Sequence, residues 1–396
     1  MIDEWGNWRL NDYSSPFNQS LAGIKVLILV GSGKVSGGTN MIFHYAHALE
    51  QRGASVTCAL LHGSEKDTIW HPLASGLTFS PWAKVSRSGW DLAIATWWPT
   101  VFELADVEAS SYLYFVQSLE SRFGRNSVDR TAEALAGATY LIGLPTIVVA
   151  SWLMGFMSSV SSAPIALVRN GLDKSLWTVE GPRLAERNPR NPRVLIEGMP
   201  GVAMKAVDET LQVCLEAGAI DVWHVSPGKA LRKGVTRGFS SVPMSSMPEI
   251  YRSVDVLVKL SRVEGMFGPP LEAFHCGATA IVSEVTGFDE YIENGINSIS
   301  VPVDDFATAT TALEYLLKEA DAIESLQKGA IETATNWPSI EESRRQFVSV
   351  CVGLLQRENG QDVDWGVLKE MKAEIEAAGK AGNDPLETIP SQFSSF

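Results

Sequence analysis

The first half of the chain alternates short apolar runs with segments of helical spacing. Residues 24–31 form an apolar run that ends at a glycine, and residues 39–53 follow with apolar side chains spaced for a helix. Further short apolar runs predict strands at 54–61, 91–97 and 112–117. Such alternation predicts a doubly wound, mostly parallel sheet, which binds its ligands at the carboxyl ends of its strands.

The same alternation restarts in the second half. The predicted strands are 193–199, 220–226, 254–261, 278–283 and 298–303, and the predicted helices are 203–218 and 306–327. The chain therefore predicts two Rossmann-like domains of similar size, at 23–175 and 193–340. Between them, residues 176–192 are polar, contain three prolines and lack apolar periodicity, so we expect a linker there.

The two ends of the chain carry weaker patterns. The N-terminal arm, 1–22, predicts no element, and the last residues of the tail (359–396), from 383 to 396, have the composition of a disordered segment. Within the tail, one predicted helix has its apolar residues on one face: Trp365, Leu368, Met371 and Ile375. We expect this amphipathic helix to dock on the body of the protein, with docking on a partner as the alternative.

Charge and cysteine content narrow the functional classes. A net charge of -14 and a pI of about 5.0 argue against general nucleic-acid binding, which needs a basic face. The four cysteines are far apart in sequence and form no CxxC pair, which is typical of buried thiols in a reducing compartment. The first twenty residues lack a basic start followed by an apolar run, so we expect a cytoplasmic protein.

One uncharged segment is long enough to span a bilayer. Residues 134–168 contain no Asp, Glu, Lys or Arg. Glycine, proline and serine interrupt the segment, and no Lys or Arg cluster flanks it. We therefore expect a buried strand at 146–151 followed by a short helix at 152–160, not a membrane span.

A glycine-rich loop, 31–38, joins the first strand to the first helix. Backbone amides and the helix dipole receive phosphates at such a position. The loop is not a Walker loop, because Lys34 lies inside it, and Gly31, Gly33 and Gly37 do not have the spacing of a dinucleotide fingerprint. It predicts either a close approach of the backbone to a ligand or a plain strand-to-helix turn.

Two glutamates, Glu264 and Glu272, flank a glycine- and proline-rich turn that enters a short helix, and we place Glu272 in its first turn. A metal site is a poor fit, since His275 is the nearest imidazole and no aspartate joins the group. A glycosidase pair would need a matched acid and base across a sugar. Ionised carboxylates that accept hydrogen bonds from sugar hydroxyls fit the pattern well, beside amides that hold a diphosphate.

At these residues the chain resembles a known family. The stretch EGMFGPPLEAFHCGATAIVSEVTGFDEYIENGINSISV is similar to the signature of family-4 retaining glycosyltransferases, which have the GT-B fold. The likeness covers residues 24–357: SGGTNMIFHYAHALEQRGASV resembles the family's first loop and helix, and VRNGLD its hinge entry. NWPSIEESRRQF resembles its crossing C-terminal helix, placed at 341–358. The resemblance implies an α/β fold of two Rossmann-like, doubly wound parallel-sheet domains that face an interdomain cleft.

The resemblance also implies roles for individual residues. Glu264 would contact the donor sugar, Glu272 the nucleotide ribose, and Lys205 would neutralise the departing diphosphate as a catalytic residue beside Glu264. The donor-binding set is Gly37, Gly38, Arg262, Gly265, Met266, Phe267, Gly268 and Glu272. Arg262 stands in this set because the family's arginine before the lysine is absent; Arg232 and Lys233 are alternatives. The plain alternatives are a helix cap for the glutamates and a solvated lysine for Lys205.

The acceptor side departs from the family pattern. Many members place a histidine at the end of a first-domain strand, where this chain has Gln117 followed by Glu120. The string YLYFVQSLESRF resembles a branch associated with rhamnosyl transfer in bacterial polysaccharide assembly. Trp97, with Trp98, is either a stacking surface for an acceptor sugar or a core residue. Gln117, Glu120 and Trp97 are therefore our weaker candidates for acceptor or sugar contacts.

The resemblance therefore implies a retaining glycosyltransferase that moves a sugar from a nucleotide-diphosphate sugar to a hydroxyl of a glycan or lipid-linked acceptor, in bacterial surface polysaccharide synthesis. We expect catalysis by positioning and electrostatics, without a metal or other cofactor. The protein would work in the cytoplasm, with the inner face of the cell membrane and its assembly machinery as a peripheral contact. The alternatives are a non-catalytic nucleotide-sugar-binding or scaffold protein and a GT-B sugar-nucleotide epimerase.

Overall fold

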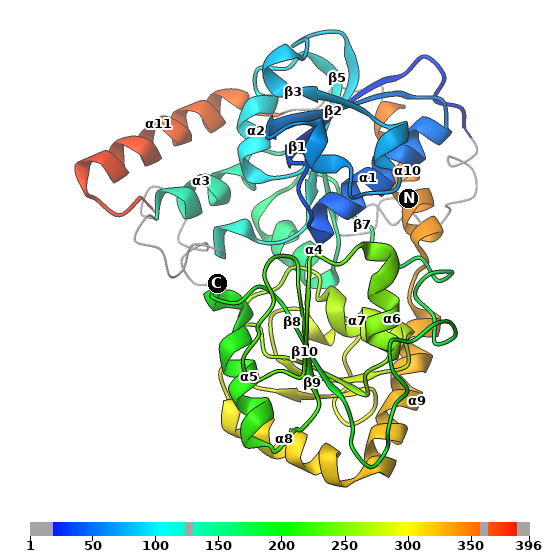
Figure 1. Ribbon diagram of the computed structural model, residues 1–396. Coiled ribbons are helices and arrows are strands. Elements are labelled where there is room, and N and C mark those ends of the chain that lie inside the picture. Colours follow the sequence, from blue (N-terminus) through cyan, green and yellow to red (C-terminus); the bar gives the residue numbers. More distant parts are fainter. Residues whose placement is uncertain (1–18, 123–129, 357–362, 386–396) are drawn as a thin grey trace. The chain divides into compact units, whose positions relative to one another are not determined.

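The computed structural model divides into two compact units, each built on one parallel sheet (Figure 1). The residues it describes are 19–122, 130–356 and 363–385. Unit 1 contains residues 1–170 and 341–396, and unit 2 contains residues 171–340. Most of the predicted N-terminal arm and the last part of the tail lie outside the described residues.

The sheet of unit 1 has seven parallel strands in the order β3-β2-β1-β4-β5-β6-β7. They are β1 (Lys25–Ser32), β2 (Ser55–His62), β3 (Thr78–Pro81), β4 (Trp90–Ala95), β5 (Ala109–Val116), β6 (Thr146–Val148) and β7 (Ile165–Leu167). The strand order reverses between β1 and β4, so the loops that leave these two strands border the position where doubly wound sheets bind ligands.

Helices cover both faces of this sheet. They are α1 (Gly37–Gln51), α2 (Trp98–Leu104), α3 (Thr131–Thr139), α4 (Ser151–Val160), α10 (Ile340–Leu355) and α11 (Trp365–Ala381). Alternate residues of β5 reach opposite faces: the Phe115 ring contacts the Phe347 ring of α10, whereas the Tyr112 ring contacts the Trp365 ring of α11. The sheet is therefore buried on both sides, which explains the near-continuous apolar runs of its strands.

Two helices from the end of the chain complete unit 1. The Tyr45 ring of α1 stacks on the Phe347 ring of α10 with centroids 4.2 Å apart. On the other face, α11 packs on α3, and its Leu368 and Ile375 are fully buried. The predicted docking of the amphipathic tail helix on the protein's own body is confirmed.

The uncharged segment 134–168 folds into the end of α3, β6, α4 and β7. The predicted strand and short helix are both present, because the glycine, proline and serine residues end each apolar run after a few residues. Within the residues that the structure describes, no helix combines the length and the apolar character needed to cross a membrane.

Unit 2 repeats this plan with six parallel strands in the order β10-β9-β8-β11-β12-β13. The strands are β8 (Val194–Glu197), β9 (Val222–Ser226), β10 (Arg237–Ser240), β11 (Val256–Lys259), β12 (Thr279–Ser283) and β13 (Ser298–Val301). The helices are α5 (Val207–Glu216), α6 (Met247–Arg252), α7 (Gly268–His275), α8 (Phe306–Lys318) and α9 (Ala320–Asn336). One face packs on α5 and α8, and the other on α6, α7 and the end of α9 (Figure 1).

Two helices predicted as continuous are interrupted in the structure. The predicted helix 203–218 is a short 3-10 turn, η6 (Ala203–Lys205), followed by α5, because Ala206 between them has a left-handed backbone with φ 45°. The predicted helix 306–327 is two helices, since Glu319 leaves the helical region with φ -114° and ψ 83°. The apolar periodicity correctly predicted helical structure in both segments. In each, one residue with a non-helical backbone divides the predicted helix in two.

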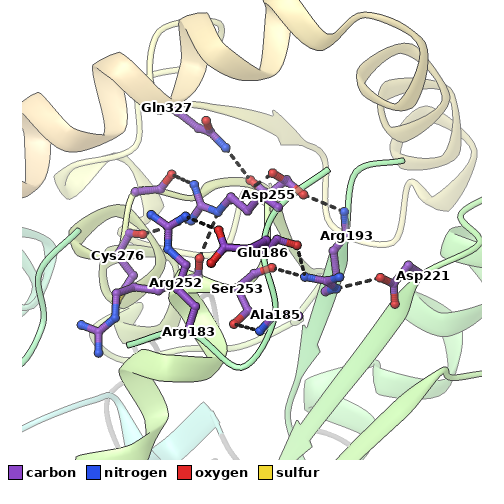
Figure 2. A network of polar contacts seen from close by, with 12 residues as sticks. Arg183, Ala185, Glu186, Arg193, Asp221, Arg252, Ser253, Asp255, Cys276 and Gln327 are labelled. Atoms are coloured by element: carbon purple, nitrogen blue, oxygen red, sulfur yellow. Dashed lines mark hydrogen bonds and ion pairs between the residues drawn. The ribbon is translucent and has the colours of Figure 1, made fainter. Parts of the chain in front are cut away.

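The segment predicted as a linker, 176–192, is part of unit 2, and hydrogen bonds hold it against the rest of that unit. Arg252 donates hydrogen bonds to carbonyl oxygens of Thr178, Glu180 and Pro182. Figure 2 shows the neighbouring polar contacts, in which the Ser253 hydroxyl accepts from the Ala185 N–H and Arg193 binds the Asp221 carboxylate at 2.7 Å. A guanidinium carries five donors, which suits it to satisfy the carbonyl groups of an irregular segment.

Candidate functional site

The carboxyl ends of β8 and β11 meet where the strand order of unit 2 reverses. Ile196 pairs with Val258 in the sheet, so the residues that end the two strands, Glu197 and Lys259, lie side by side. The Lys259 Nζ is 2.6 Å from Oε2 of Glu197 and also donates to the Glu197 carbonyl oxygen at 3.3 Å. The Lys259 side chain is 1% exposed, so a positive charge is buried at the expected ligand position.

Glu264 extends this pair into a cluster of four charges. Its Oε1 lies 3.5 Å from the Lys259 Nζ, and both of its carboxylate oxygens lie 2.8 Å from the Nζ of Lys205. The four groups alternate in sign, and we call Glu197, Lys259, Glu264 and Lys205 the charge cluster. The structure thus brings together the two residues predicted to be catalytic, Lys205 and Glu264, with the Glu264 side chain only 9% exposed.

The backbone around Lys205 explains how its side chain reaches Glu264. Lys205 ends the η6 turn, and the left-handed Ala206 that follows redirects the chain into α5. Arg262 holds the turn in place: its backbone N–H donates to the Met204 carbonyl oxygen at 2.8 Å, and its guanidinium donates to that of Ala203. A left-handed alanine costs about 1–2 kcal/mol, a cost that surrounding contacts such as these must offset.

Arg262 is itself fully engaged on unit 2. Its guanidinium binds Glu209 at 2.8 Å and Asp304 at 2.6 Å, in addition to the η6 carbonyl. The structure therefore places Arg262 next to the predicted site as a support for the Lys205 turn. A role in which Arg262 binds the donor directly would require it to leave these carboxylates.

The charges in the cluster keep Glu264 and Lys259 ionised. Burial alone would raise the pKa of Glu264, but the charges of Lys259 and Lys205 hold that pKa below its usual range. Burial would likewise lower the pKa of Lys259, and the carboxylates of Glu197 and Glu264 reverse this and raise it. At neutral pH, Glu264 is therefore a carboxylate and Lys259 an ammonium group.

Glu272 is outside the charge cluster, but the charges of Glu197 and Lys259 act on it. α7 begins at Gly268, so Glu272 is in the second turn of this helix; its predicted place in the first turn was wrong, because the helix begins before the two prolines. Burial and the nearby charge of Glu197 raise the pKa of Glu272 to about 7, against the opposing effects of the Tyr251 hydroxyl and Lys259. Glu272 therefore titrates near neutral pH.

The turn between the glutamates, 265–268, is fixed by core contacts. Phe267 is buried, and its carbonyl oxygen accepts a hydrogen bond from the Tyr291 hydroxyl. Met266 packs at the edge of the same core, and its carbonyl oxygen accepts from the Gly268 N–H at 2.9 Å. Since the two prolines that follow carry no N–H, the start of α7 offers fewer amide hydrogens to a phosphate than the sequence analysis assumed.

The glycine loop of unit 1 is shaped partly by packing. A Cβ on Gly31 would lie 2.6 Å from the Trp97 ring, and a Cβ on Gly33 would lie 2.6 Å from the Thr68 methyl group. Both positions therefore require glycine for reasons unrelated to a ligand. Trp97 is half-buried against this loop, which favours a role in packing over a role as a stacking surface for an acceptor sugar.

Gly37 and Gly38 differ from the other glycines of this loop. They open α1, whose first turn is capped by the Ser36 hydroxyl accepting from the Thr39 N–H at 3.0 Å. A Cβ on Gly37 would meet no atom within 4 Å, whereas one on Gly38 would lie 3.1 Å from the Gln117 amide. The structure brings Gly38 and Gln117 together, and packing gives no reason for a glycine at position 37.

Glu120 is tied into unit 1 by its own carboxylate. Its Oε2 accepts from the backbone N–H of Trp98 at 2.9 Å, at the start of α2, and its backbone N–H donates to the Tyr140 hydroxyl at 3.1 Å. Burial raises the pKa of Glu120 to about 8. These contacts give Glu120 a structural use that the sequence analysis did not anticipate.

In the ranges that the structure describes, no three His, Cys, Asp or Glu side chains are grouped so that they could hold a metal ion. His275, the imidazole nearest to Glu272 in sequence, has its Nδ1 2.8 Å from the Leu271 carbonyl oxygen, one turn earlier in α7.

The sequence analysis missed Glu197 and Lys259. The available signal was weak: a charged residue at the last position of an otherwise apolar strand, in VLIE and in VLVK. Glu197 and Lys259 are 62 residues apart in sequence, and only the strand order of the sheet makes them neighbours.

Residues 183–319 match the family model for glycosyl transferases group 1. This match contains all four members of the charge cluster, together with Glu272. A search of curated protein sequences finds no match to this chain.

Several solved structures have a similar fold. Sucrose-phosphate synthase from Thermosynechococcus elongatus has a TM-score of 0.62 and 14% identity, covering 85% of this chain and 98% of its own. HepE from Anabaena, in complex with UDP and glucose, has a TM-score of 0.66 and 13% identity, covering 84% of this chain and 100% of its own. WaaG, a glycosyltransferase involved in lipopolysaccharide biosynthesis, has a TM-score of 0.61 and 12% identity, covering 84% of this chain and 99% of its own. The predicted α/β GT-B fold is confirmed.

Proposed function

We propose that this protein is a retaining glycosyltransferase that uses a nucleotide-diphosphate sugar as donor. The group 1 match and the GT-B fold support glycosyltransferase activity. The observation that carries the proposal is the pairing of Lys205 with both oxygens of Glu264, at the point where the sheet of unit 2 reverses. An ammonium group and a carboxylate at this place are suited to a diphosphate and to sugar hydroxyls respectively.

Each of the three residues predicted to bind the donor then has its own role. Lys205, whose side chain is 30% exposed, turns from Glu264 to the diphosphate of the donor. Glu264 accepts hydrogen bonds from hydroxyls of the transferred sugar, and Glu272 accepts them from the ribose. Gly37 belongs to the donor contacts in this proposal because a glycine there leaves open space that packing does not require.

The chemical step needs little more than these positions. The bond between the anomeric carbon and the phosphate oxygen breaks, and its electron pair stays on the diphosphate, whose charge Lys205 stabilises. The acceptor oxygen attacks the same face of the sugar, and its proton passes to the departing phosphate oxygen. In this proposal Lys205 supplies the positive charge, no metal ion takes part, and rate enhancement comes from positioning and electrostatics.

For the acceptor we propose a hydroxyl of a glycan or a lipid-linked saccharide in bacterial surface polysaccharide synthesis, at the cytoplasmic face of the membrane. The structural likeness to WaaG and to an outer core galactosyltransferase of lipopolysaccharide, WaaB, is consistent with such an acceptor. Transfer of a deoxyhexose such as rhamnose rests on the resemblance of residues 112–123 alone.

A turnover assay tests the proposal. The protein is incubated with UDP-, GDP- and dTDP-sugars and a panel of glycan and lipid-linked acceptors, and released nucleotide diphosphate is measured. We expect release that depends on one donor class and on an acceptor, with the anomeric configuration of the donor kept in the product by NMR. Glu264→Ala should abolish release, whereas Glu324→Ala, an exposed glutamate on α9, should not change it.

The same assay separates the alternatives. A non-catalytic binding protein would bind a nucleotide sugar and release nothing with any acceptor. An epimerase would change the sugar while it remains on the nucleotide, or act without an acceptor. An inverted anomeric configuration in the product would contradict the retaining mechanism while leaving the transferase activity intact.

A further inference from the structure

Lys205 has two tasks that exclude each other. In the structure its Nζ contacts both oxygens of Glu264 at 2.8 Å. In the proposed reaction the same ammonium group binds the diphosphate of the donor. When Lys205 turns to the ligand, the largely buried Glu264 carboxylate loses its closest positive charge.

A buried carboxylate without a cation is unfavourable. It either costs several kcal/mol or takes up a proton, because burial disfavours the charged form. A protonated Glu264 would have lost an acceptor site for sugar hydroxyls. The site therefore needs a second positive charge that stays when Lys205 leaves.

Lys259 has the properties of that charge. It ends β11, its side chain is 1% exposed, and its Nζ is 3.5 Å from Oε1 of Glu264. Its bonds to the carboxylate and carbonyl of Glu197 fix the ammonium group in place. In contrast to Lys205, it is buried within the sheet end and is not placed to turn to an outside ligand.

We propose that Lys259 is the permanent counter-ion of Glu264, which lets Lys205 exchange Glu264 for an anionic ligand without a proton entering the site. The inference rests on the proposed function, since the ligand is the nucleoside diphosphate part of the donor. Lys259 is a positioning residue: it acts on the donor through Glu264 and touches no reacting atom.

Among the residues that the structure describes, the surroundings of Glu264 offer no other cation for this task. The titratable groups that act on Glu264 itself are Lys205 of the η6 turn, Lys259 of β11 and Tyr291 of the segment before β13. Around them, Glu197 of β8, Glu272 of α7 and Tyr251 of α6 act on Lys259 or on one another. Among these, only the two lysines are positive. Arg262, nearby in sequence, is bonded to Glu209 and Asp304.

The test is nucleoside diphosphate binding by Lys259→Met in the full-length protein. UDP, GDP and dTDP are titrated calorimetrically at pH 7.5 and 8.5, in buffers of different ionisation enthalpy, to count protons taken up. The nucleotide is fully ionised at both pH values, because the terminal phosphate titrates near pH 6. We expect Lys259→Met to take up close to one proton more than wild type, and its affinity to fall about tenfold per pH unit relative to wild type.

Arg187→Met is the matched control. Arg187 is another partly buried cation of unit 2, bonded to the carbonyl oxygens of Cys276 and Gly277 at the end of α7. Its loss should lower stability without changing the proton count on binding. Lys259→Arg, which keeps the charge, should restore binding without the extra proton. Equal proton uptake and equal pH dependence in Lys259→Met and wild type would overturn the proposal.

A ligand-free arm separates this inference from the proposed function. Without Lys259, Glu264 keeps only Lys205, so the stability of Lys259→Met should fall as pH rises from 6 to 8, relative to wild type. Adding Glu264→Gln removes this carboxylate and should remove most of that slope; the remainder belongs to Glu272, whose pKa Lys259 also lowers. If Lys259→Met does not fold but the double variant does, the counter-ion role is supported; if neither folds while Glu264→Gln does, it is contradicted. Failure of wild type to bind any nucleotide would instead refute the proposed function.

Discussion

At the residue scale, Glu272 gives the site a dependence on pH. Its pKa of about 7 in the folded protein exceeds the value of 4.5 expected for an exposed glutamate. Between these values the folded protein keeps a proton that the unfolded chain has lost, so stability falls as pH rises. The contribution of Glu272 is fully present below about pH 4.5 and is lost once the pH passes 7.

We predict that Glu272→Gln is as stable as wild type at pH 5 and more stable at pH 8, by about 2–3 kcal/mol, because the amide cannot ionise. Urea unfolding without nucleotide at pH 5, 7 and 8 measures this. The exposed Glu332→Gln is the control and should show no such difference. Glu120, whose pKa is also raised, contributes equally to all three proteins. A pH-independent difference would contradict the assignment.

Lys205 carries the second prediction at this scale. Lys205→Met should weaken nucleoside diphosphate binding about 10–100-fold, the effect of losing a hydrogen-bonded charge pair of about 1.5–3 kcal/mol. Calorimetric titration with UDP, GDP and dTDP measures it. Lys233→Ala is the comparison variant: it removes an exposed lysine that the sequence analysis named as an alternative to Arg262 in the donor-binding set. A loss of affinity in Lys233→Ala with none in Lys205→Met would move the phosphate contact away from the charge cluster.

At the element scale, the loop between β1 and α1 contains two kinds of glycine: some have no room for a side chain, and Gly37 has open space around it. Gly31→Ala places a Cβ 2.6 Å from the Trp97 ring, so we expect a loss of stability of about 1–3 kcal/mol. Gly37→Ala meets nothing within 4 Å at the first position of α1, so its stability should change by less than about 0.5 kcal/mol.

If Gly37 contacts the donor, Gly37→Ala should nevertheless weaken binding of the complete nucleotide sugar. Thermal unfolding and calorimetry on the same samples separate the two effects. Unchanged donor affinity in a stable Gly37→Ala protein would remove the loop of unit 1 from the donor contacts. It would leave the contacts of unit 2 as they are.

A comparison of predicted and observed elements shows which parts of the fold the sequence could predict. The long apolar strands and the amphipathic helices were predicted, because burial on both faces of a parallel sheet leaves uninterrupted apolar runs. Strands β3, β7 and β10 were missed. β3 (TFSP) and β10 (RGFS) are edge strands without an apolar run, and β7 (IAL) is a run of only three residues. The break at Ala206 was missed because alanine favours a helix and its positive φ depends on tertiary contacts.

The site was predictable to the extent that its residues are close in sequence or match a family signature. Glu264 and Glu272 were found in this way, and Lys205 through the resemblance. Lys259 and Glu197 are 62 residues apart, and they meet only because β8 and β11 are neighbours in the sheet. The raised pKa of Glu272 depends on the same neighbourhood, so no local pattern could indicate it.

At the scale of the whole molecule, the two units differ in how the chain builds them. Unit 2 is one continuous stretch, 171–340, with helices on both faces of its sheet. Unit 1 takes α10 and α11 from the end of the chain, and these cover Tyr45, Phe115 and Tyr112.

We therefore predict that residues 171–340 fold cooperatively as a fragment, whereas residues 1–170 do not, because the latter would expose the aromatic side chains that α10 and α11 cover. Far-UV circular dichroism and urea unfolding of the two fragments measure this. A cooperative transition of fragment 1–170 alone would contradict the role given to the two C-terminal helices.

The measurement that tests the central claim most directly is the thermal unfolding midpoint of wild type and Glu264→Ala with UDP-, GDP- and dTDP-sugars. A ligand at a hundred times its dissociation constant adds about 2.7 kcal/mol, enough to raise the midpoint by several degrees. The account predicts that one class of donor raises the midpoint of wild type and that Glu264→Ala loses the shift. If no nucleotide sugar shifts folded wild-type protein, or if the Glu264 variant keeps the full shift, the charge cluster is not the donor site.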